Sequence, residues 1–196
     1  IAYSIEVALK SNLFDEVMVS TDDNEIAKIS EKYNANVPFF RSKKSADDFA
    51  TLADVIDEVI AQYRQTGLFF EYGCCILPTA PLIQLKKIIE AYQLLKARDF
   101  DSVKPIVPFT YPIQRALRYQ EGSVEMMNPE YAKTRSQDLE QAYHDAGQFY
   151  WFQYSMGLRG ARKGAIVLSE NEIQDIDTND DWKMAEIKYK AILTNH

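Results

Sequence analysis

The segment Tyr72-Gly73-Cys74-Cys75-Ile76-Leu77, followed directly by Pro78-Thr79-Ala80-Pro81, constrains the architecture of this chain most strongly. An almost wholly apolar run of this length, ended by two prolines, is typical of a strand whose two faces are both covered. Strands of that kind occur in sheets that carry helices on both sides. The segment therefore predicts the central strand of a layered α/β domain.

Helical and strand patterns alternate on both sides of this segment. Apolar residues recur at helical spacing over residues 2–11, 24–33, 51–65, 84–97 and 180–193. Short β-prone runs occupy residues 16–20, 36–40, 101–107, 148–154 and 165–169. This alternation predicts a three-layer α/β fold with a mostly parallel sheet, joined by right-handed crossovers.

The pattern changes over residues 109–145. This stretch contains Pro112, Gly122, Pro129 and many polar residues, with a hairpin signal at Glu121-Gly122 and no long periodic helix. We expect it to form an arm inserted into a single domain that spans residues 1–196.

Composition excludes several classes of protein. The chain has 196 residues, 46% of them hydrophobic, which fits one globular domain with a sizeable core. A formal net charge of -7 disfavours a nucleic-acid groove or an anionic membrane surface as a partner. The apolar runs are shorter than the roughly 20 residues of a membrane helix. We therefore expect neither nucleic-acid nor membrane partners.

The cysteine and histidine counts remove further chemistries. Cys74 and Cys75 are adjacent within an apolar run, which suits buried thiols and predicts a reduced, cytoplasmic protein. His144 and His196 are the two histidines of the chain, so a multi-histidine zinc site cannot be built. His144-Asp145 is compatible with a base and its orienting acid, but a hydrogen-bonded loop histidine is the commoner explanation.

Asp175-Ile176-Asp177 is the strongest candidate for a metal site. Two carboxylates separated by one residue on an extended segment point to the same side. Carboxylate oxygens suit Mg²⁺, which binds through one or two of them together with substrate phosphates. Thr178 and Asn179 support the alternative that the acids belong to the cap of the following helix. Taken alone, the local pattern favours the cap.

Polar segments also follow two of the predicted strands. They are Ser20-Thr21-Asp22 and residues 78–81. Ligands of open α/β sheets sit outside the carboxyl ends of the strands, so these segments and Asp175-Ile176-Asp177 are candidate ligand-binding positions. Each is unspecific alone, because helix caps also explain Thr21 and Asp22.

The order of these motifs resembles that of the acylneuraminate cytidylyltransferase family, over essentially the whole chain. Within that family the chain is most similar to the group that acts on pseudaminic acid. The matching features are Val19-Ser20-Thr21-Asp22, Arg41, Pro78-Thr79-Ala80-Pro81-Leu82, Arg135-Ser136-Gln137-Asp138-Leu139, Tyr143-His144-Asp145-Ala146-Gly147-Gln148-Phe149-Tyr150-Trp151 and Asp175-Ile176-Asp177.

The resemblance implies a Rossmann-like nucleotidyltransferase fold and a specific reaction. A nine-carbon nonulosonic acid would attack the α-phosphate of CTP and release pyrophosphate, with Asp175 and Asp177 as ligands of Mg²⁺ and as catalytic residues. N-acetylneuraminate and 3-deoxy-manno-octulosonate are alternative sugars. A noncatalytic α/β dimerisation module is a further alternative.

The resemblance also implies roles for other residues. Arg41, Asp47, Thr51, Pro78 and Thr79 would lie at the nucleotide, although Thr51 is equally well explained as the N-cap of the helix that follows it. A separate expectation concerns Arg135, which would bind the sugar carboxylate as a catalytic residue.

Two larger expectations follow from the same resemblance. Residues 109–141 correspond to an arm that reaches across a homodimer and helps to build the partner's sugar pocket. The family also has a Gly-rich basic loop that cradles the triphosphate, and we expect that loop to be missing from residues 1–196.

Overall fold

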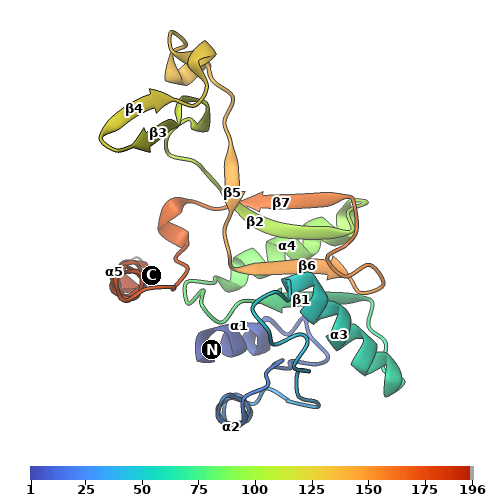
Figure 1. The fold of residues 1–196 in the computed structure, drawn as a ribbon. Coiled ribbons are helices and arrows are strands. Elements are labelled where there is room, and N and C mark those ends of the chain that lie inside the picture. The colour runs from blue at the N-terminus through green and yellow to red at the C-terminus, as the bar shows by residue number, and fades with distance from the viewer. Residues whose placement is uncertain (195–196) are drawn as a thin grey trace.

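The computed structural model of this protein describes residues 1–194 (Figure 1). Its α-helices are α1 (Ala2–Ser11), α2 (Asn24–Lys32), α3 (Leu52–Gln65), α4 (Leu85–Ala97) and α5 (Asn179–Thr194). Its strands are β1 (Tyr72–Ile76), β2 (Ser102–Pro108), β3 (Leu117–Gln120), β4 (Ser123–Met126), β5 (Tyr143–Asp145), β6 (Phe149–Gln153) and β7 (Lys163–Val167). Short 3₁₀ helices are η1 (Ile113–Arg115), η2 (Pro129–Tyr131), η3 (Ser136–Asp138) and η4 (Glu170–Glu172).

Local sequence signals explain why the helices begin and end where they do. In α3 the Thr51 hydroxyl accepts a hydrogen bond from Asp54 N while the Asp54 carboxylate accepts one from Thr51 N, which is a capping box. Ile56 and Ile60 lie one turn apart and are buried. Gly67 follows the helix with a φ of 81°, a left-handed conformation that glycine adopts without strain. None of the helices within residues 1–194 is long and apolar enough to span a bilayer.

Helices pack on both faces of the main sheet, which gives three layers. On one face Ile88 of α4 joins a core cluster with Phe149 and Trp151 of β6. On the other face Ile56 of α3 packs with Phe152 of the same strand. Because alternate residues of β6 point to opposite faces, this aromatic strand contributes to both cores. The α/β class and the layered arrangement are therefore as the sequence predicts.

The prediction of a mostly parallel sheet is wrong. The strand order is β1-β6-β2-β5, and β7 pairs with β2. β6 lies antiparallel to both β1 and β2, β5 is antiparallel to β2, and β7 is parallel to β2. Strand-helix alternation correctly indicated that β1 and β2 run in the same direction through α4. It did not indicate that a strand from much later in the chain would separate them.

Two strand predictions also need correction. β1 is an edge strand and not the central one, because it pairs along one edge with β6 and lies at the end of the strand order in the part of the chain described. Both of its faces are covered as predicted, since Cys74 packs against one core cluster and Cys75 against the other. The predicted strands 16–20 and 36–40 meet at a single parallel bridge between Met18 and Asn36. The next bond, from Arg41 N to Thr21 O, is out of register with that bridge, so no ladder continues.

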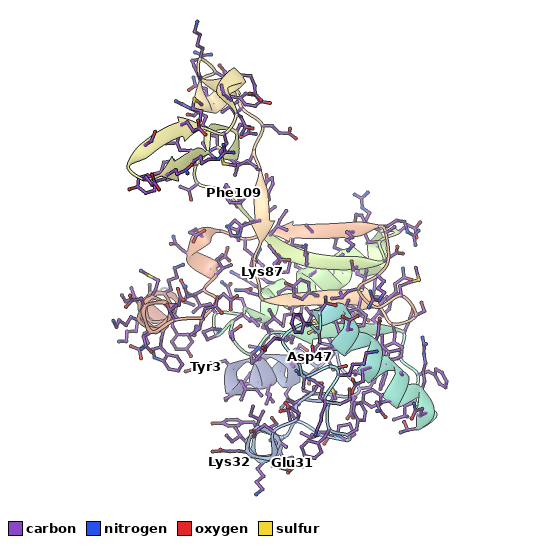
Figure 2. The ribbon with its side chains drawn as sticks, in the orientation of Figure 1. Tyr3, Glu31, Lys32, Asp47, Lys87 and Phe109 are labelled. Carbon is purple, nitrogen blue, oxygen red and sulfur yellow. The ribbon has the colours of Figure 1, made fainter. Side chains whose placement is uncertain are left out.

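The chain leaves the main sheet after β2 and returns to it as β5. Between them the β3–β4 hairpin and η1, η2 and η3 form an arm that projects from the end of the sheet (Figure 1). Figure 2 shows Phe109 at the point where the arm joins the body. There Phe109 N donates to Ala142 O at 3.0 Å, and Gln141 Nε2 donates to Phe109 O at 3.1 Å. Because Tyr143–Asp145 already pairs with β2, the excursion ends before the predicted residue 145.

Candidate functional site

The carboxyl end of β1 is where the predicted site segments meet. Leu77 N donates to Gln148 O at 2.8 Å, which joins this strand end to the start of β6. Two residues further on, Thr79 O accepts a hydrogen bond of 3.2 Å from Ile176 N. Ile176 stands between the two candidate metal-binding acids. The turn at Pro78 and Thr79 is therefore tied directly to the segment that carries the acids.

Asp175 and Asp177 lie on the extended stretch between η4 and α5. Both side chains are exposed, whereas Ile176 between them is half-buried. Asp175 Oδ1 accepts a hydrogen bond of 3.0 Å from Ile176 N. No ion pair within residues 1–194 involves either carboxylate. The two exposed acids thus flank a half-buried residue, and neither carboxylate is held by an ion pair in the described part of the chain.

The cap of α5 uses different side chains. Thr178 Oγ1 accepts from Asp181 N at 3.2 Å, and Asp181 Oδ2 accepts from Thr178 N at 2.9 Å. The hydroxyl and amide hydrogen bonds from Thr178 lower the pKa of the Asp181 carboxyl. Asp177 contributes only its backbone N–H, which donates to Asp181 Oδ2 at 3.3 Å. The capping interpretation is therefore correct for Thr178. The carboxylates of Asp175 and Asp177 take no part in the cap.

The donor set matches Mg²⁺ better than a transition metal. Across the described part of the chain there is no group of three or more His, Cys, Asp or Glu side chains able to hold a metal ion. Zinc sites usually need three or four such protein ligands. Mg²⁺ keeps several waters and needs only one or two carboxylates when a ligand supplies phosphate oxygens. A pair of exposed aspartates at a strand end fits that requirement.

A hydrogen-bonded cluster around Asp145 lies beside Asp175. Asp145 Oδ1 accepts from Gly147 N at 2.9 Å and from the Tyr150 hydroxyl at 3.1 Å. Asp145 Oδ2 forms an ion pair of 2.7 Å with Lys104 Nζ. Burial raises the pKa of the Tyr150 phenol, and the negative charges of Asp145 and Asp175 raise it further. Tyr150 therefore stays protonated and acts as a hydrogen-bond donor at this edge of the sheet.

Sequence reasoning missed this cluster. It examined His144-Asp145 as a base and its orienting acid, with a loop histidine as the commoner alternative. The structure agrees with the alternative, because His144 Nδ1 lies 2.8 Å from Asp145 O and the ring packs against Phe109. Besides the neighbouring Gly147, the partners of Asp145 are Lys104 of β2 and Tyr150 of β6, and no local spacing in the sequence reveals the ion pair with Lys104.

Arg41 lies near Cys75 of β1. Its Nε donates to Ser20 Oγ at 3.1 Å and its Nη2 to Ser20 O at 2.5 Å. Burial raises the pKa of the Cys75 thiol to about 11, and the nearby Arg41 guanidinium opposes that shift. Arg41 is thus hydrogen-bonded to Ser20 and lies close enough to β1 to affect Cys75.

Thr51 and Asp47 have local structural duties. The Thr51 hydroxyl donates to Asp54 Oδ2 at 2.6 Å within the capping box of α3. Asp47 Oδ1 accepts from Phe49 N at 2.9 Å and from Ala50 N at 2.8 Å, which shapes the loop before that helix. Asp47 lies on the body of the molecule, as Figure 2 shows. The N-cap interpretation of Thr51 is correct, and its hydroxyl is committed to Asp54 in this structure.

Arg135 is not near the two aspartates in this chain. It lies in the arm, just before η3, and is exposed to solvent. Its guanidinium holds the Asp138 carboxylate through two bonds, Nε to Oδ2 at 2.8 Å and Nη2 to Oδ1 at 3.2 Å. One chain therefore brings Asp175, Asp177, Pro78 and Thr79 together but leaves Arg135 apart from them.

Comparison with known proteins defines the class. The family model described as Cytidylyltransferase matches residues 1–191. The chain belongs to this family of nucleotidyltransferases.

Individual relatives are more specific. The chain is 38% identical to a pseudaminic acid cytidylyltransferase of Campylobacter jejuni, over 97% of this chain and 85% of that protein. It is 30% identical to N-acylneuraminate cytidylyltransferase A of Danio rerio, over 95% of this chain and 44% of that protein.

A solved structure of CMP:2-keto-3-deoxy-manno-octonic acid synthetase complexed with CTP has a TM-score of 0.65 with this chain. It shares 10% identity, covering 99% of this chain and 88% of that one. At that level of identity the likeness concerns the fold alone. It supports the α/β class described above.

Proposed function

We propose that this protein transfers CMP from CTP to a nonulosonic acid, with pseudaminic acid as the favoured sugar, and releases pyrophosphate. The bond from Ile176 N to Thr79 O carries this proposal, because it fixes Asp175 and Asp177 at the carboxyl end of β1. Ligands of open α/β sheets bind at that end of the strands. The similarity to the Campylobacter jejuni enzyme supports the choice of sugar.

In the proposed reaction the anomeric oxygen of the sugar attacks the α-phosphorus of CTP in line. The new P–O bond forms as the bond to pyrophosphate breaks, and the proton of the sugar hydroxyl passes to solvent water. Reactions of this class depend mainly on positioning and on stabilisation of charge. Asp175 and Asp177 would hold Mg²⁺, which supplies positive charge beside the phosphate oxygens when it is bound.

The nucleotide would lie between the turn at Pro78 and Thr79 and the segment that contains Arg41. Arg41 has a guanidinium edge already directed at Ser20, close to β1. Asp47 and Thr51 shape the neighbouring loop, so we assign them the support of the cytidine site. Binding by backbone and loop groups of this kind orients a nucleotide without needing a basic surface, which agrees with the net charge of -7.

Arg135 would bind the carboxylate of the sugar acid. Its guanidinium already grips a carboxylate through two parallel bonds, that of Asp138. A planar guanidinium binds a ligand carboxylate in the same bidentate way, so the sugar acid would replace Asp138 as its partner. Since Arg135 lies in the arm, we place it in the sugar pocket of a second copy of the chain.

A homodimer follows from that placement. On one face of the arm hairpin, Leu117 opposes Met126 and Tyr119 opposes Val124. Tyr119 is 73% exposed and Leu117 is 58% exposed. An isolated two-stranded hairpin is marginally stable in water, so an apolar face of this kind needs a partner. We also place the reaction in the cytoplasm, because Cys74 and Cys75 are both free thiols.

Turnover by the purified full-length protein tests the proposal. Pyrophosphate release would be measured with CTP, UTP or ATP, each paired with pseudaminic acid, N-acetylneuraminate or 3-deoxy-manno-octulosonate. We expect release that requires Mg²⁺, with CTP and pseudaminic acid giving the highest kcat/KM. Equal rates with the three nucleotides would reject the cytidine assignment. Preference for another sugar would reject the choice of pseudaminic acid, and no release with any pair would reject the enzyme assignment.

A further inference from the structure

We propose that Gln148 and Gly147 are positioning residues for Asp175. They hold it in the orientation needed to bind a divalent cation together with a nucleoside triphosphate. This inference rests on the proposed function of Asp175. Neither residue is assigned to touch the substrate. Their role is to fix the backbone and the carboxylate of a residue that does.

Gln148 is a buried polar side chain that links two parts of the site. Gln148 is only 1% exposed, and its Nε2 donates to Glu172 O at 2.8 Å. Its backbone carbonyl accepts from Leu77 N at 2.8 Å. A buried amide is costly unless it is hydrogen-bonded, so this geometry is strongly held. Gln148 therefore ties the end of β1 to the segment that leads into Asp175.

The acceptor of that bond is itself fixed. Glu172 forms a capping box with Ser169 in η4, and its Oε1 accepts from Gln84 Nε2 at 3.2 Å. The next residue, Ile173, is 8% exposed and belongs to the main core. Only Gln174 then separates this anchored point from Asp175. A shift of the Glu172 carbonyl would therefore pass directly into the position of Asp175.

Gly147 is a close neighbour of the Asp175 carboxylate. A Cβ atom at residue 147 would lie 3.3 Å from Asp175 Oδ2, closer than most side-chain contacts. The φ of Gly147 is 62°, which a larger residue adopts only with strain. Asp145 Oδ1 accepts from Gly147 N at 2.9 Å and keeps this turn in place. The absence of a side chain at Gly147 thus leaves room for the Asp175 carboxylate in its present orientation, and a larger residue would press against Oδ2.

Residues of this kind tune a metal site without contacting the metal. Groups that orient the ligands of a metal typically change its affinity by roughly 10- to 100-fold when they are replaced. A structural role alone would lower stability without changing affinity for a metal-nucleotide pair. Metal binding, measured apart from turnover, therefore distinguishes the two roles.

The first experiment replaces Gln148 by methionine, which keeps the length of the side chain and removes its N–H donor. Gln153→Met is the matched control. Gln153 lies at the far end of the same strand, and its Nε2 also donates to a backbone carbonyl, Phe100 O, at 2.8 Å in a partly buried position. Binding of Mn²⁺ to the full-length protein at a fixed CTP concentration would be followed by electron paramagnetic resonance, alongside thermal melting.

We expect Gln148→Met to weaken CTP-dependent Mn²⁺ binding by about 10-fold or more. Gln153→Met should lower the melting temperature by a similar amount while its Mn²⁺ binding stays at the wild-type level. Equal Mn²⁺ binding by the two variants would overturn the positioning role while leaving the proposed function intact. Absence of CTP-dependent Mn²⁺ binding by the wild-type protein would instead overturn the proposed function, and the positioning role with it.

A second pair of variants decides the matter if Gln148→Met does not fold. Gly147→Ala adds a methyl group against Asp175 Oδ2, whereas Gly67→Ala adds one where nothing lies within 4 Å. Both glycines have left-handed φ values, 62° and 81°, so both substitutions carry backbone strain. We expect only Gly147→Ala to weaken Mn²⁺ binding in the presence of CTP. Unchanged binding by Gly147→Ala would contradict the proposal.

Discussion

At the scale of single residues, the acids near the carboxyl terminus separate into two groups with different roles. Asp181 is held by Thr178 at the start of α5, and its pKa is lowered by those hydrogen bonds. Asp175 and Asp177 keep exposed carboxylates. The first group stabilises a helix, and the second is available to a cation. The local sequence could not separate these roles, because all three acids fit both patterns.

Asp177→Asn tests the role of the second group. The substitution removes a charge with little change of volume, and the Asp177 side chain makes no contact on which the cap of α5 depends. We expect kcat/KM for pyrophosphate release to fall by at least about 100-fold with the melting temperature unchanged. Asp180→Asn is the control, since Asp180 is an exposed acid of the same turn that pairs with Lys183. Near-normal turnover by Asp177→Asn would remove Asp177 from the metal site.

Other residues of the site were beyond prediction from the sequence. Contacts between distant elements bring three further residues to this edge of the sheet. The ion pair of Lys104 with Asp145 joins β2 to β5, and Gln148 bonds to the segment after β7. No spacing rule relates positions so far apart in the chain. Asp175 and Asp177 could be proposed from the sequence because their alternation is local.

At the scale of elements, helices were predicted more accurately than strands. The expected helix 2–11 coincides with α1, and the others differ from the observed bounds by a single residue at either end. Helix signals are local, as the capping box and the buried Ile56 and Ile60 of α3 show. Strand pairing depends on distant partners. The position of β6 between β1 and β2, and the failure of residues 16–20 to form a ladder, therefore had no local signal.

The capping box of α3 gives a prediction about pH. Hydrogen bonds from Thr51, with a further contribution from Arg159, lower the pKa of Asp54 to about 2. A carboxyl whose pKa is lower in the folded state adds stability above its unfolded pKa of about 4, and that stability is lost as the pH falls toward 2. We expect Asp54→Asn to lower the free energy of unfolding in urea at pH 7.

The difference between wild type and Asp54→Asn should stay constant down to about pH 4 and shrink below it. Asp48→Asn serves as the control, because Asp48 is an exposed acid in the loop before the same helix. A difference that grows as the pH falls would contradict the assignment of this carboxylate to the cap.

At the scale of the whole molecule, the body and the arm differ in how they bury apolar residues. The body has two packed cores, one on each face of the main sheet. The arm has exposed apolar residues on its hairpin, and Arg135 belongs to it. Figure 1 shows the hairpin β3–β4 standing away from the main sheet. Its polar composition indicated an excursion in the sequence. The direction of the arm could not be predicted from the sequence, because it depends on how β2 and β5 pair at the end of the main sheet.

Tyr119→Lys tests the proposed homodimer. It places a charge on the apolar face of the hairpin, whereas Gln120→Lys places one on the opposite face of the same strand. We expect light scattering to show a dimer for the wild type and Gln120→Lys, and a monomer for Tyr119→Lys. Turnover should be lost with the dimer, since Arg135 then serves no partner. A wild-type monomer with full turnover would refute the shared site.

The most direct measurement is a crystal structure of the full-length protein with CTP and Mn²⁺, using anomalous diffraction to locate the metal. We predict one Mn²⁺ bound by oxygens of Asp175 and Asp177 and by the phosphates of CTP, at the carboxyl end of β1. A metal peak elsewhere, or CTP bound away from these two aspartates, would contradict the assignment of this site to cytidylyl transfer.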